Sequence, residues 1–170
     1  MTKIDNFFES IKDKKVAFCG LGISNFPVME MFVNKGIDVT ACDRRNFEDL
    51  GDNAKKAEEL GVKLSLGDNY LKNLDVDIVF RTPGMKYYMD ELVEMRSRGV
   101  VVTSEMELFF ELADCHIIAV TGSDGKTTTT SMLTHILLQA DTDPTVSVGG
   151  MLDRIGGNIR VGHSDLFLTE

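Results

Sequence analysis

The sequence has 170 residues, of which 43% are hydrophobic and 26% are charged, and its formal net charge is −9. A chain of this length buries one sizeable core or two small ones, and the composition is typical of a soluble globular protein. The negative charge argues against non-specific binding to nucleic acid. No apolar run approaches the ~18 residues that span a bilayer, so we expect no membrane insertion.

The amino terminus and the cysteines indicate the cellular compartment of the protein. Residues 1–15 alternate apolar and charged side chains and lack the continuous apolar core of a secretory signal, which predicts a cytoplasmic protein. The three cysteines, Cys19, Cys42 and Cys115, show no CxxC spacing and each lies in or beside an apolar run. We expect buried free thiols rather than metal ligands or a redox pair.

Strand-like and helix-like segments alternate over the first hundred residues, which predicts parallel strands joined by crossover helices. The fold class is therefore α/β, beginning with a Rossmann-like parallel sheet. Strands are expected at residues 15–19, 38–42, 62–66, 76–80 and 100–103. Helices are expected between Phe26 and Gly36 and at residues 47–60 and 89–98.

The character of the chain changes near residue 102, where we place a domain boundary. Ser104, with Glu107 three residues later, resembles a capping box that opens a short connecting helix. A new strand is expected at residues 115–120, followed by a glycine-containing loop and a helix. One face of that helix should carry Met132, Leu133, Ile136 and Leu137. The predicted domains are residues 1–102 and 103–170.

The first glycine turn is Gly20-Leu21-Gly22-Ile23-Ser24-Asn25, which has GxG but lacks the last glycine of a dinucleotide fingerprint. It follows a predicted strand and opens a helix, so its backbone amides could face a diphosphate. Asp43 stands at the end of the second strand, where a carboxylate can recognise a ribose or base. A tight turn with a helix-capping serine is the alternative, and Arg44 and Arg45 fit surface cations equally well.

The second glycine turn, residues 122–127 (GSDGKT), is shorter than a Walker A loop, because Val120 stands where the first glycine of GxxxxGK[ST] would be. Its chemistry still fits phosphate binding. Gly122 and Gly125 let the backbone wrap around an oxyanion, Lys126 can reach terminal phosphates, and the Thr127 hydroxyl can approach Mg²⁺. The alternative is a polar, capped helix start that only happens to contain GKT.

The run TGSDGKTTTT after an apolar strand resembles the ATP loop of the Mur ligases, the amide-forming enzymes of peptidoglycan precursor synthesis. GLGIS at residues 20–24, the turn Thr82-Pro83-Gly84 and the connector TSEMELFFEL extend the resemblance. Over residues 14–130 the chain looks most like the D-glutamate-adding branch. Residues 141–170 look partly like the L-alanine-adding branch, although GGNI within them is similar to the D-glutamate-adding one.

The resemblance implies a reaction and a role for each domain. The first domain would bind the UDP part of a UDP-N-acetylmuramoyl peptide, and the second would be the start of a P-loop ATPase domain that binds ATP and Mg²⁺. The substrate carboxylate would become an acyl phosphate, which the amine of the incoming amino acid attacks to give an amide, ADP and phosphate. In the D-glutamate-adding branch, D-glutamate is joined to UDP-N-acetylmuramoyl-L-alanine.

The resemblance also assigns candidate residues. The uridine diphosphate pocket would include Ile23, Ser24, Asp43, Arg44, Thr82, Pro83 and Gly84. ATP would be held by Gly122, Ser123, Asp124, Gly125, Lys126, Thr127 and Thr128. The implied catalytic residues are Lys126, Thr127 and Asn158, and the implied metal ligands are Thr127 and Glu170. Asn158 also fits a turn beside glycine, and Glu170 an exposed carboxylate.

The sequence stops at Glu170, before the rest of a Mur-type central domain and the amino-acid-binding third domain. We therefore expect no ligase turnover from this chain alone, and an exposed sheet edge that favours self-association. Two other function classes stay open. One is a nicotinamide-dependent oxidoreductase that would use GLGIS and Asp43, and the other is a non-catalytic module that binds a UDP-sugar or nucleotide.

Overall fold

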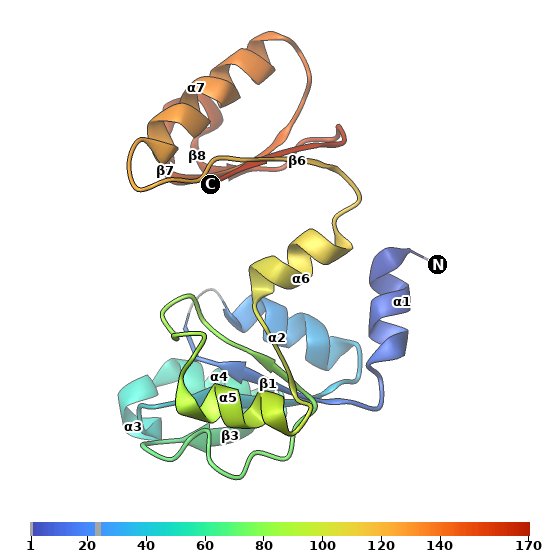
Figure 1. The fold of residues 1–170 in the computed structure, drawn as a ribbon, viewed down its shortest axis with the longest axis vertical. Coiled ribbons are helices and arrows are strands. Elements are labelled where there is room, and N and C mark those ends of the chain that lie inside the picture. Colours follow the sequence, from blue (N-terminus) through green and yellow to red (C-terminus); the bar gives the residue numbers. More distant parts are fainter. Residues whose placement is uncertain (1, 23–24) are drawn as a thin grey trace. The chain divides into compact units, whose positions relative to one another are not determined.

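The computed structural model describes residues 2–22 and 25–170, which fall into two compact units, residues 1–112 and 113–170 (Figure 1). Each unit has its own sheet and its own buried apolar clusters. The mixed α/β class expected from the sequence is confirmed.

The first unit is built on five parallel strands in the order β3-β2-β1-β4-β5. The strands are β1 (Lys15–Cys19), β2 (Asp38–Asp43), β3 (Lys63–Leu66), β4 (Ile78–Phe80) and β5 (Val101–Thr103). The central strands are apolar runs because both faces of the sheet are covered. The strand order reverses between β1 and β4, and open parallel sheets bind ligands at such a switch point, outside the carboxyl ends of the strands.

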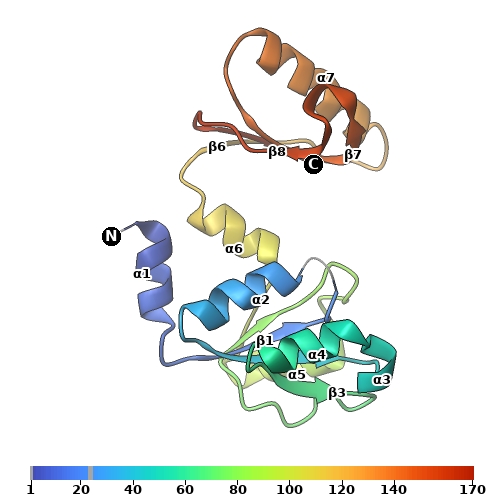
Figure 2. The same cartoon turned by 180° about the vertical axis from the view of Figure 1, so that it is seen from behind.

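Helices cover both faces of this sheet (Figure 2). They are α1 (Lys3–Ser10), α2 (Asn25–Asn34), α3 (Phe47–Leu50), α4 (Asp52–Glu59), α5 (Asp90–Ser97) and α6 (Glu105–Leu112). On one face the Phe18 and Phe80 rings stack at 4.6 Å, and Phe32 of α2 meets both edge-on. On the other face Leu92 and Met95 of α5 pack in a second buried cluster. Successive residues of a strand therefore pack into the cores on opposite faces of the sheet.

Two details differ from the expectation. The helix expected at residues 47–60 is divided at Gly51, whose φ of +55° is outside the helical region. The segment that follows β5 belongs to the first unit, because Leu108 of α6 is buried in the same cluster as Phe8 and Ile11. The compact units therefore divide after residue 112, whereas the sequence pattern favoured a boundary near residue 102.

The second unit has a four-stranded sheet in the order β6-β9-β7-β8. Its elements are β6 (His116–Ala119), α7 (Lys126–Gln139), β7 (Thr145–Leu152), the 3₁₀ turn η1 (Asp153–Ile155), β8 (Gly157–Arg160) and β9 (Leu166–Thr169). β6, β9 and β7 are parallel, and β8 pairs antiparallel with β7. Val146, Val148 and Leu168 form the core of this unit.

The helix α7 packs on this sheet, but the apolar pattern predicts only part of the face that it buries. Leu133 and Leu137 pack against the core as expected. Met132 and Ile136 are instead 55% and 62% exposed. The buried residues of the helix are two threonines, Thr130 and Thr134, whereas the two leucines are only partly buried. The Thr134 hydroxyl donates a 2.8 Å hydrogen bond to the Thr130 carbonyl, which satisfies it inside the helix.

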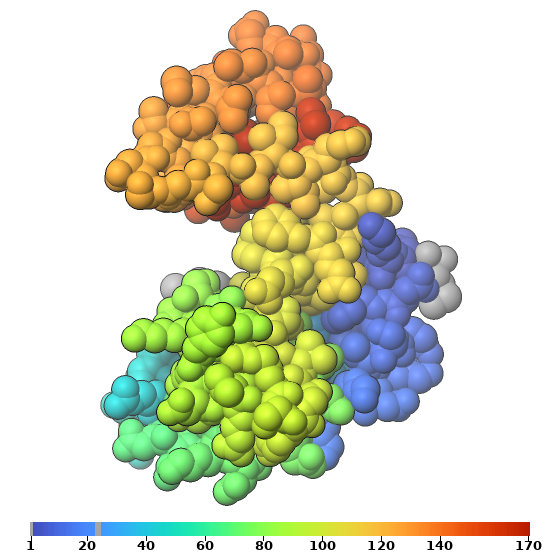
Figure 3. All heavy atoms as spheres, in the orientation of Figure 1, coloured from blue at the N-terminus to red at the C-terminus, as the bar shows by residue number. Residues whose placement is uncertain are grey.

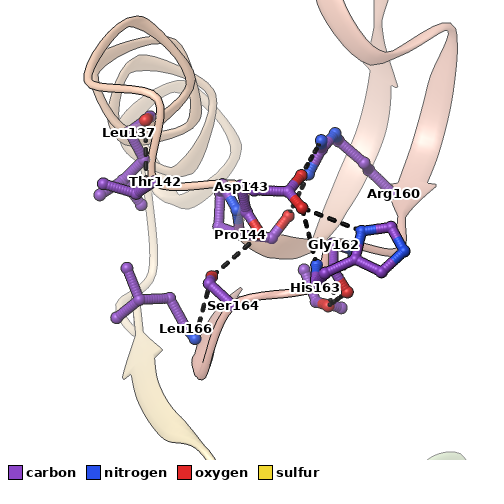
Figure 4. A network of polar contacts seen from close by, with 10 residues as sticks. Leu137, Thr142, Asp143, Pro144, Arg160, Gly162, His163, Ser164 and Leu166 are labelled. Carbon is purple, nitrogen blue, oxygen red and sulfur yellow. Dashed lines mark hydrogen bonds and ion pairs between the residues drawn. The ribbon is translucent and has the colours of Figure 1, made fainter.

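A polar network fastens the loop after α7 to the loop before β9 (Figure 4). The Asp143 carboxylate forms an ion pair with Arg160, and its Oδ2 accepts 2.9 Å hydrogen bonds from the His163 backbone N–H and from its ring Nδ1. The Ser164 hydroxyl donates to the Asp143 carbonyl at 2.9 Å. These bonds lower the pKa of Asp143 to about 2, chiefly through Arg160.

The thiols match the sequence expectation in two of three positions. Cys19 and Cys42 are free and buried, and Cys115 is free and half-buried. Burial raises the pKa of Cys19 to about 12, so this thiol is inert near neutral pH. Among the described residues, no helix has both the length and the apolar character needed to cross a membrane.

Candidate nucleotide-binding sites

The first glycine turn leaves β1 at Gly20 and is held from three sides. The Leu21 N–H donates to Asp43 Oδ2 at 2.9 Å. The Asn25 side chain donates to the carbonyls of Cys19 and Gly20 at 2.6 and 2.9 Å, and Asn53 donates to the Leu21 carbonyl at 3.0 Å. The turn is thus fixed by side chains from β2, α2 and α4. Sequence reasoning missed Asn25 and Asn53 because a single asparagine in a helix carries no distinctive spacing.

Asp43 is 7% exposed, and groups of the protein itself occupy the hydrogen-bond acceptor sites of its carboxylate. Besides Leu21, it accepts the Arg45 backbone N–H at 2.9 Å and a two-pronged bond from the Arg45 guanidinium at 3.1 and 3.0 Å. Burial acts to raise the pKa of Asp43, but the hydrogen bonds from Arg45 and Leu21 outweigh it and lower the pKa. A carboxylate offers about four lone-pair sites, so these bonds saturate it.

Three further residues were assigned to the uridine diphosphate pocket, of which one is exposed and two lie outside the described residues. The Arg44 Nε is 3.8 Å from the Asp68 carboxylate, and both side chains are more than 80% exposed. An exposed pair of this kind is weak, so Arg44 can reorient toward a ligand. Ile23 and Ser24 lie outside the described residues.

The Thr82-Pro83-Gly84 turn lies against the first glycine turn. It follows β4 after one residue, Arg81, and the Met85 N–H closes it by donating to the Thr82 carbonyl at 3.0 Å. A Cβ built on Gly20 would be only 2.9 Å from Thr82 Cγ2, so the two turns are in close contact. Since β1 and β4 flank the switch point, both turns lie where ligands bind in such folds.

In the second unit, the loop between β6 and α7 ends at Gly125, whose φ of +73° places it in the left-handed region just before the helix begins. The Lys126 ammonium donates to the carbonyls of Gly122 and Ser123 at 2.8 and 3.3 Å. Its charge therefore lies over the loop. Ser123, Asp124 and Thr128 are exposed. Free backbone N–H groups at a helix start favour an anion.

Thr127 and Glu170 meet beside this loop, although 43 residues separate them. The Thr127 hydroxyl donates to Glu170 Oε1 at 2.8 Å, and the Gly149 N–H donates to the same oxygen. The Thr130 hydroxyl lies 3.4 Å from Glu170 Oε2. The start of α7, the end of β9 and the middle of β7 thus converge on one carboxylate.

Two glycines of β7 make this convergence sterically feasible. A Cβ on Gly149 would overlap Glu170 Oε1 and lie 3.4 Å from Thr127 Oγ1, and one on Gly150 would lie 3.2 Å from Thr127 Cγ2. No role was predicted for these two glycines from the sequence. Their contact with Glu170 depends on strand pairing, which the sequence does not display.

The chemistry of the cluster fits Mg²⁺. Hydroxyl and carboxylate oxygens are its preferred donors, and Mg²⁺ is usually held by one or two carboxylates together with substrate phosphates rather than by an all-protein cage. Among residues 2–22 and 25–170 there is no grouping of three or more His, Cys, Asp or Glu side chains that could hold a metal ion.

Comparisons with known proteins identify the family of the chain. Residues 120–164 match the family model of the Mur ligase middle domain. The chain is 42% identical over 161 residues to the UDP-N-acetylmuramoylalanine–D-glutamate ligase of Acetivibrio thermocellus, covering 94% of this chain and 33% of the relative. It is 43% identical to the enzyme of the same name from Ruminiclostridium cellulolyticum, covering 92% and 32%. The chain belongs to the Mur ligase family.

This Mur ligase chain spans about a third of the length of those relatives. Among solved structures, it resembles a murein peptide ligase from Psychrobacter arcticus with a TM-score of 0.50 and 25% identity, covering 92% of this chain and 37% of the other. The UDP-N-acetylmuramate:L-alanyl-gamma-D-glutamyl-meso-diaminopimelate ligase from Neisseria meningitides shares the fold, with a TM-score of 0.51 at 23% identity, covering 92% of this chain and 52% of the other.

The similarity to D-glutamate ligases is not confined to residues 14–130. A match to 94% of the chain leaves only about ten residues unmatched and must include most of residues 141–170. Asn158, which belongs to this segment of the Mur ligase chain, lies exposed on β8. No hydrogen bond within the described part of the chain joins it to Lys126, Thr127 or Glu170, so its assignment as a catalytic residue stays a prediction.

Proposed function

We propose that the chain is the amino-terminal part of an ATP-dependent ligase that adds D-glutamate to UDP-N-acetylmuramoyl-L-alanine through an acyl phosphate. The observation that carries this proposal is the convergence of Thr127, Gly149 and Glu170 beside a lysine-bearing phosphate loop. The 42–43% identity to D-glutamate ligases supports the choice of amino acid over the L-alanine-adding alternative.

At the nucleotide side, the loop residues 122–125 and the start of α7 would bind the phosphates of ATP through backbone N–H groups. Lys126 would exchange its bonds to the Gly122 and Ser123 carbonyls for terminal phosphate oxygens. Thr127 and Glu170 would hold Mg²⁺, and Thr128 would face the phosphates. Bound Mg²⁺ would neutralise the charge that builds up on the transferring phosphoryl group.

A carboxylate is a poor electrophile for an amine, which is why activation is needed. Phosphorylation gives it a leaving group, and the protein has to align the attacking carboxylate with the γ-phosphate and stabilise the negative charge. In this chain, Lys126 and the loop amides would supply that stabilisation. The hydrogen bonds of Thr127 and Gly149 to Glu170 orient the carboxylate before ligand arrives.

At the substrate side, the two turns at the switch point would bind the uridine diphosphate. The Gly20–Gly22 turn would present backbone amides to the diphosphate, and Arg44 would reach the nucleotide from the end of β2. Asp43 would act by fixing the turn, because its acceptor sites are already occupied by Leu21 and Arg45. Thr82, Pro83 and Gly84 would form the opposite wall.

We further propose that this chain by itself binds these ligands without turnover, since it spans only a third of its relatives. We place its action in the cytoplasm. β6 is an edge strand in the four-stranded sheet, and all its residues are exposed, which supports self-association through that edge.

Calorimetry on the 170-residue chain tests the proposal. Titrations with ATP–Mg²⁺, UDP-N-acetylmuramoyl-L-alanine, UDP-N-acetylmuramate and NADH should show binding of ATP–Mg²⁺ and the UDP-sugars but not NADH. Binding of NADH without UDP-sugar binding would instead support an oxidoreductase. A coupled ADP-release assay with D-glutamate and L-alanine should show no sustained turnover, and multiple turnovers would overturn that part of the proposal.

A further inference from the structure

The loop between β4 and α5 carries the Thr82-Pro83-Gly84 turn and is long for its kind. Loops from a strand to a helix in α/β units usually have about two to six residues, whereas this one runs from residue 81 to residue 89. In Figure 3 the loop and α5, coloured yellow-green, form a continuous part of the surface of the first unit. Two local turns, closed by the Met85 and Met89 N–H groups, are its internal backbone hydrogen bonds. Local turns do not fix a loop against the sheet, so other elements have to do so.

Tyr87, in the middle of this loop, is held by Arg96 of α5. The Arg96 Nη2 atom donates a 2.6 Å hydrogen bond to the Tyr87 carbonyl, and the guanidinium carbon lies 4.1 Å from the centroid of the Tyr87 ring. One side chain therefore binds both the backbone and the ring of the same residue. Within the described part of the chain, no other hydrogen bond joins residues 82–88 to a segment outside the loop.

The Tyr87 ring also lies near a second cation, Arg81, at the start of the loop. The guanidinium carbon of Arg81 is 5.9 Å from the ring centroid. The Arg81 N–H donates to the Thr103 carbonyl of β5 at 2.9 Å, which fixes this end of the loop to the sheet. Guanidinium groups are attracted to an aromatic face within about 6 Å. The ring thus links the beginning of the loop to the helix that follows it.

Arg96 is placed to act on the loop rather than on a ligand. The strands β4 and β5 are parallel, so α5 runs from their carboxyl ends back toward their amino ends. Arg96 lies in the last turn of α5, about 9 Å along the helix axis from Asp90 at 1.5 Å per residue. Side chains of a helix tilt toward its amino terminus, so the long Arg96 side chain reaches back to Tyr87.

We propose that Arg96 is a positioning residue for the uridine diphosphate site. By holding Tyr87, it keeps the Thr82-Pro83-Gly84 turn against the first glycine turn, which Thr82 contacts so closely that a Cβ on Gly20 would lie 2.9 Å from its Cγ2. A wall that is fixed before the ligand arrives lowers the ordering cost of binding. This inference rests on the proposed function, because UDP has to bind between these two turns.

Calorimetry with UDP and the 170-residue chain tests the inference. Arg96→Met keeps the apolar stem of the side chain but removes the donor and the charge. We expect about tenfold weaker UDP binding, the effect of one hydrogen bond to a charged group, with ATP–Mg²⁺ binding unchanged. Arg98→Met is the matched control, since Arg98 makes only an exposed pair with Glu94 at 4.0 Å, and it should bind UDP within about twofold of wild type.

Two outcomes separate the inference from the proposed function. Wild-type UDP affinity in Arg96→Met, with or without a loss of stability in urea, would overturn the positioning role and leave the proposed function standing. If the wild-type chain binds neither UDP nor UDP-N-acetylmuramate, the proposed function itself is rejected.

Variants of Tyr87 test the same contact from the loop side and do not depend on the folding of Arg96→Met. Tyr87→Phe keeps the ring and the carbonyl, so it should bind UDP like wild type. Tyr87→Leu removes the ring and should weaken UDP binding about threefold. The double variant of Arg96→Met and Tyr87→Leu should bind no more weakly than Arg96→Met, because both changes break one contact. Losses that multiply, or full affinity in Tyr87→Leu, would contradict a joint role.

Discussion

The Thr127 hydroxyl donates a 2.8 Å hydrogen bond to Glu170 Oε1, linking the first turn of α7 to the residue after β9. If the pair holds Mg²⁺ beside the nucleotide, Thr127→Val should weaken ATP–Mg²⁺ binding about tenfold or more. The reason is that a hydrogen bond to a charged group contributes about 1.5–3 kcal/mol, and an oxygen donor to the metal is lost as well. Calorimetry with ATP in the presence and absence of Mg²⁺ measures this.

Thr127→Ser is the matched control, because it keeps the hydroxyl and should bind ATP–Mg²⁺ within about threefold of wild type. ATP binding in EDTA should differ little among the three proteins. An equal loss in EDTA for Thr127→Val would show that Thr127 acts on the loop rather than on the metal.

Gly149→Ala should separate Glu170 from Thr127 without altering either residue. The new Cβ would overlap Glu170 Oε1, and the carboxylate is the flexible partner that has to move. We expect about tenfold weaker ATP–Mg²⁺ binding with little change in the melting temperature. Gly157→Ala in β8 is the control, since a Cβ there meets no atom within 4 Å. Equal ATP–Mg²⁺ affinity of wild type and Gly149→Ala would contradict this assignment.

Local sequence patterns predicted the strands of the first unit well, because apolar runs such as Val16–Cys19 form strands buried on both faces wherever they pair. They did not predict the helix α1. The patterns did not reveal β7 and β8, whose glycines and polar residues weaken the strand signal. The face of α7 that packs on the sheet contains Thr130 and Thr134 as well as two leucines. Apolar periodicity therefore placed Met132 and Ile136 on this face, although both are exposed.

The site was predictable only where its chemistry lies in one short segment. Lys126 and Thr127 follow from the loop itself. The role of Gly149 depends on the pairing of β7 with β9, in which Ser147 lies opposite Thr169 and the next residues bring Gly149 to Glu170. Asp43 was recognised as a carboxylate at the end of a strand. Its bonds to Arg45 are local, but its bond to Leu21 joins residues 22 apart, and spacing does not reveal that contact.

Asp43→Asn tests whether the first glycine turn depends on this carboxylate. An amide has one acceptor oxygen and would face the Leu21 and Arg45 donors with its own NH₂ group. We expect a loss of about 1–3 kcal/mol in the free energy of unfolding and at least tenfold weaker binding of UDP. Urea unfolding and calorimetry measure the two effects.

Asp38→Asn is the control for this change, because it lies in the same strand but forms an exposed pair with Lys63 at 2.6 Å. Exposed pairs contribute about 0–1 kcal/mol, so this variant should unfold within that range of wild type and bind UDP normally. If the two aspartate variants behave alike, Asp43 has no special part in the turn.

The Asp143 network should make the second unit sensitive to acid. Its folded-state pKa of about 2 lies below the ordinary value of 3.8, because Arg160 and His163 favour the carboxylate. A lowered pKa stabilises the folded state fully above pH 4, and this contribution is lost as the pH falls from about 4 to about 2. Asp143→Asn should therefore lower the free energy of unfolding at pH 6, and the gap between variant and wild type should close over that acid range. Urea unfolding followed at several pH values measures the gap, and a constant gap down to pH 2 would show that the Asp143 ion pair contributes no acid sensitivity.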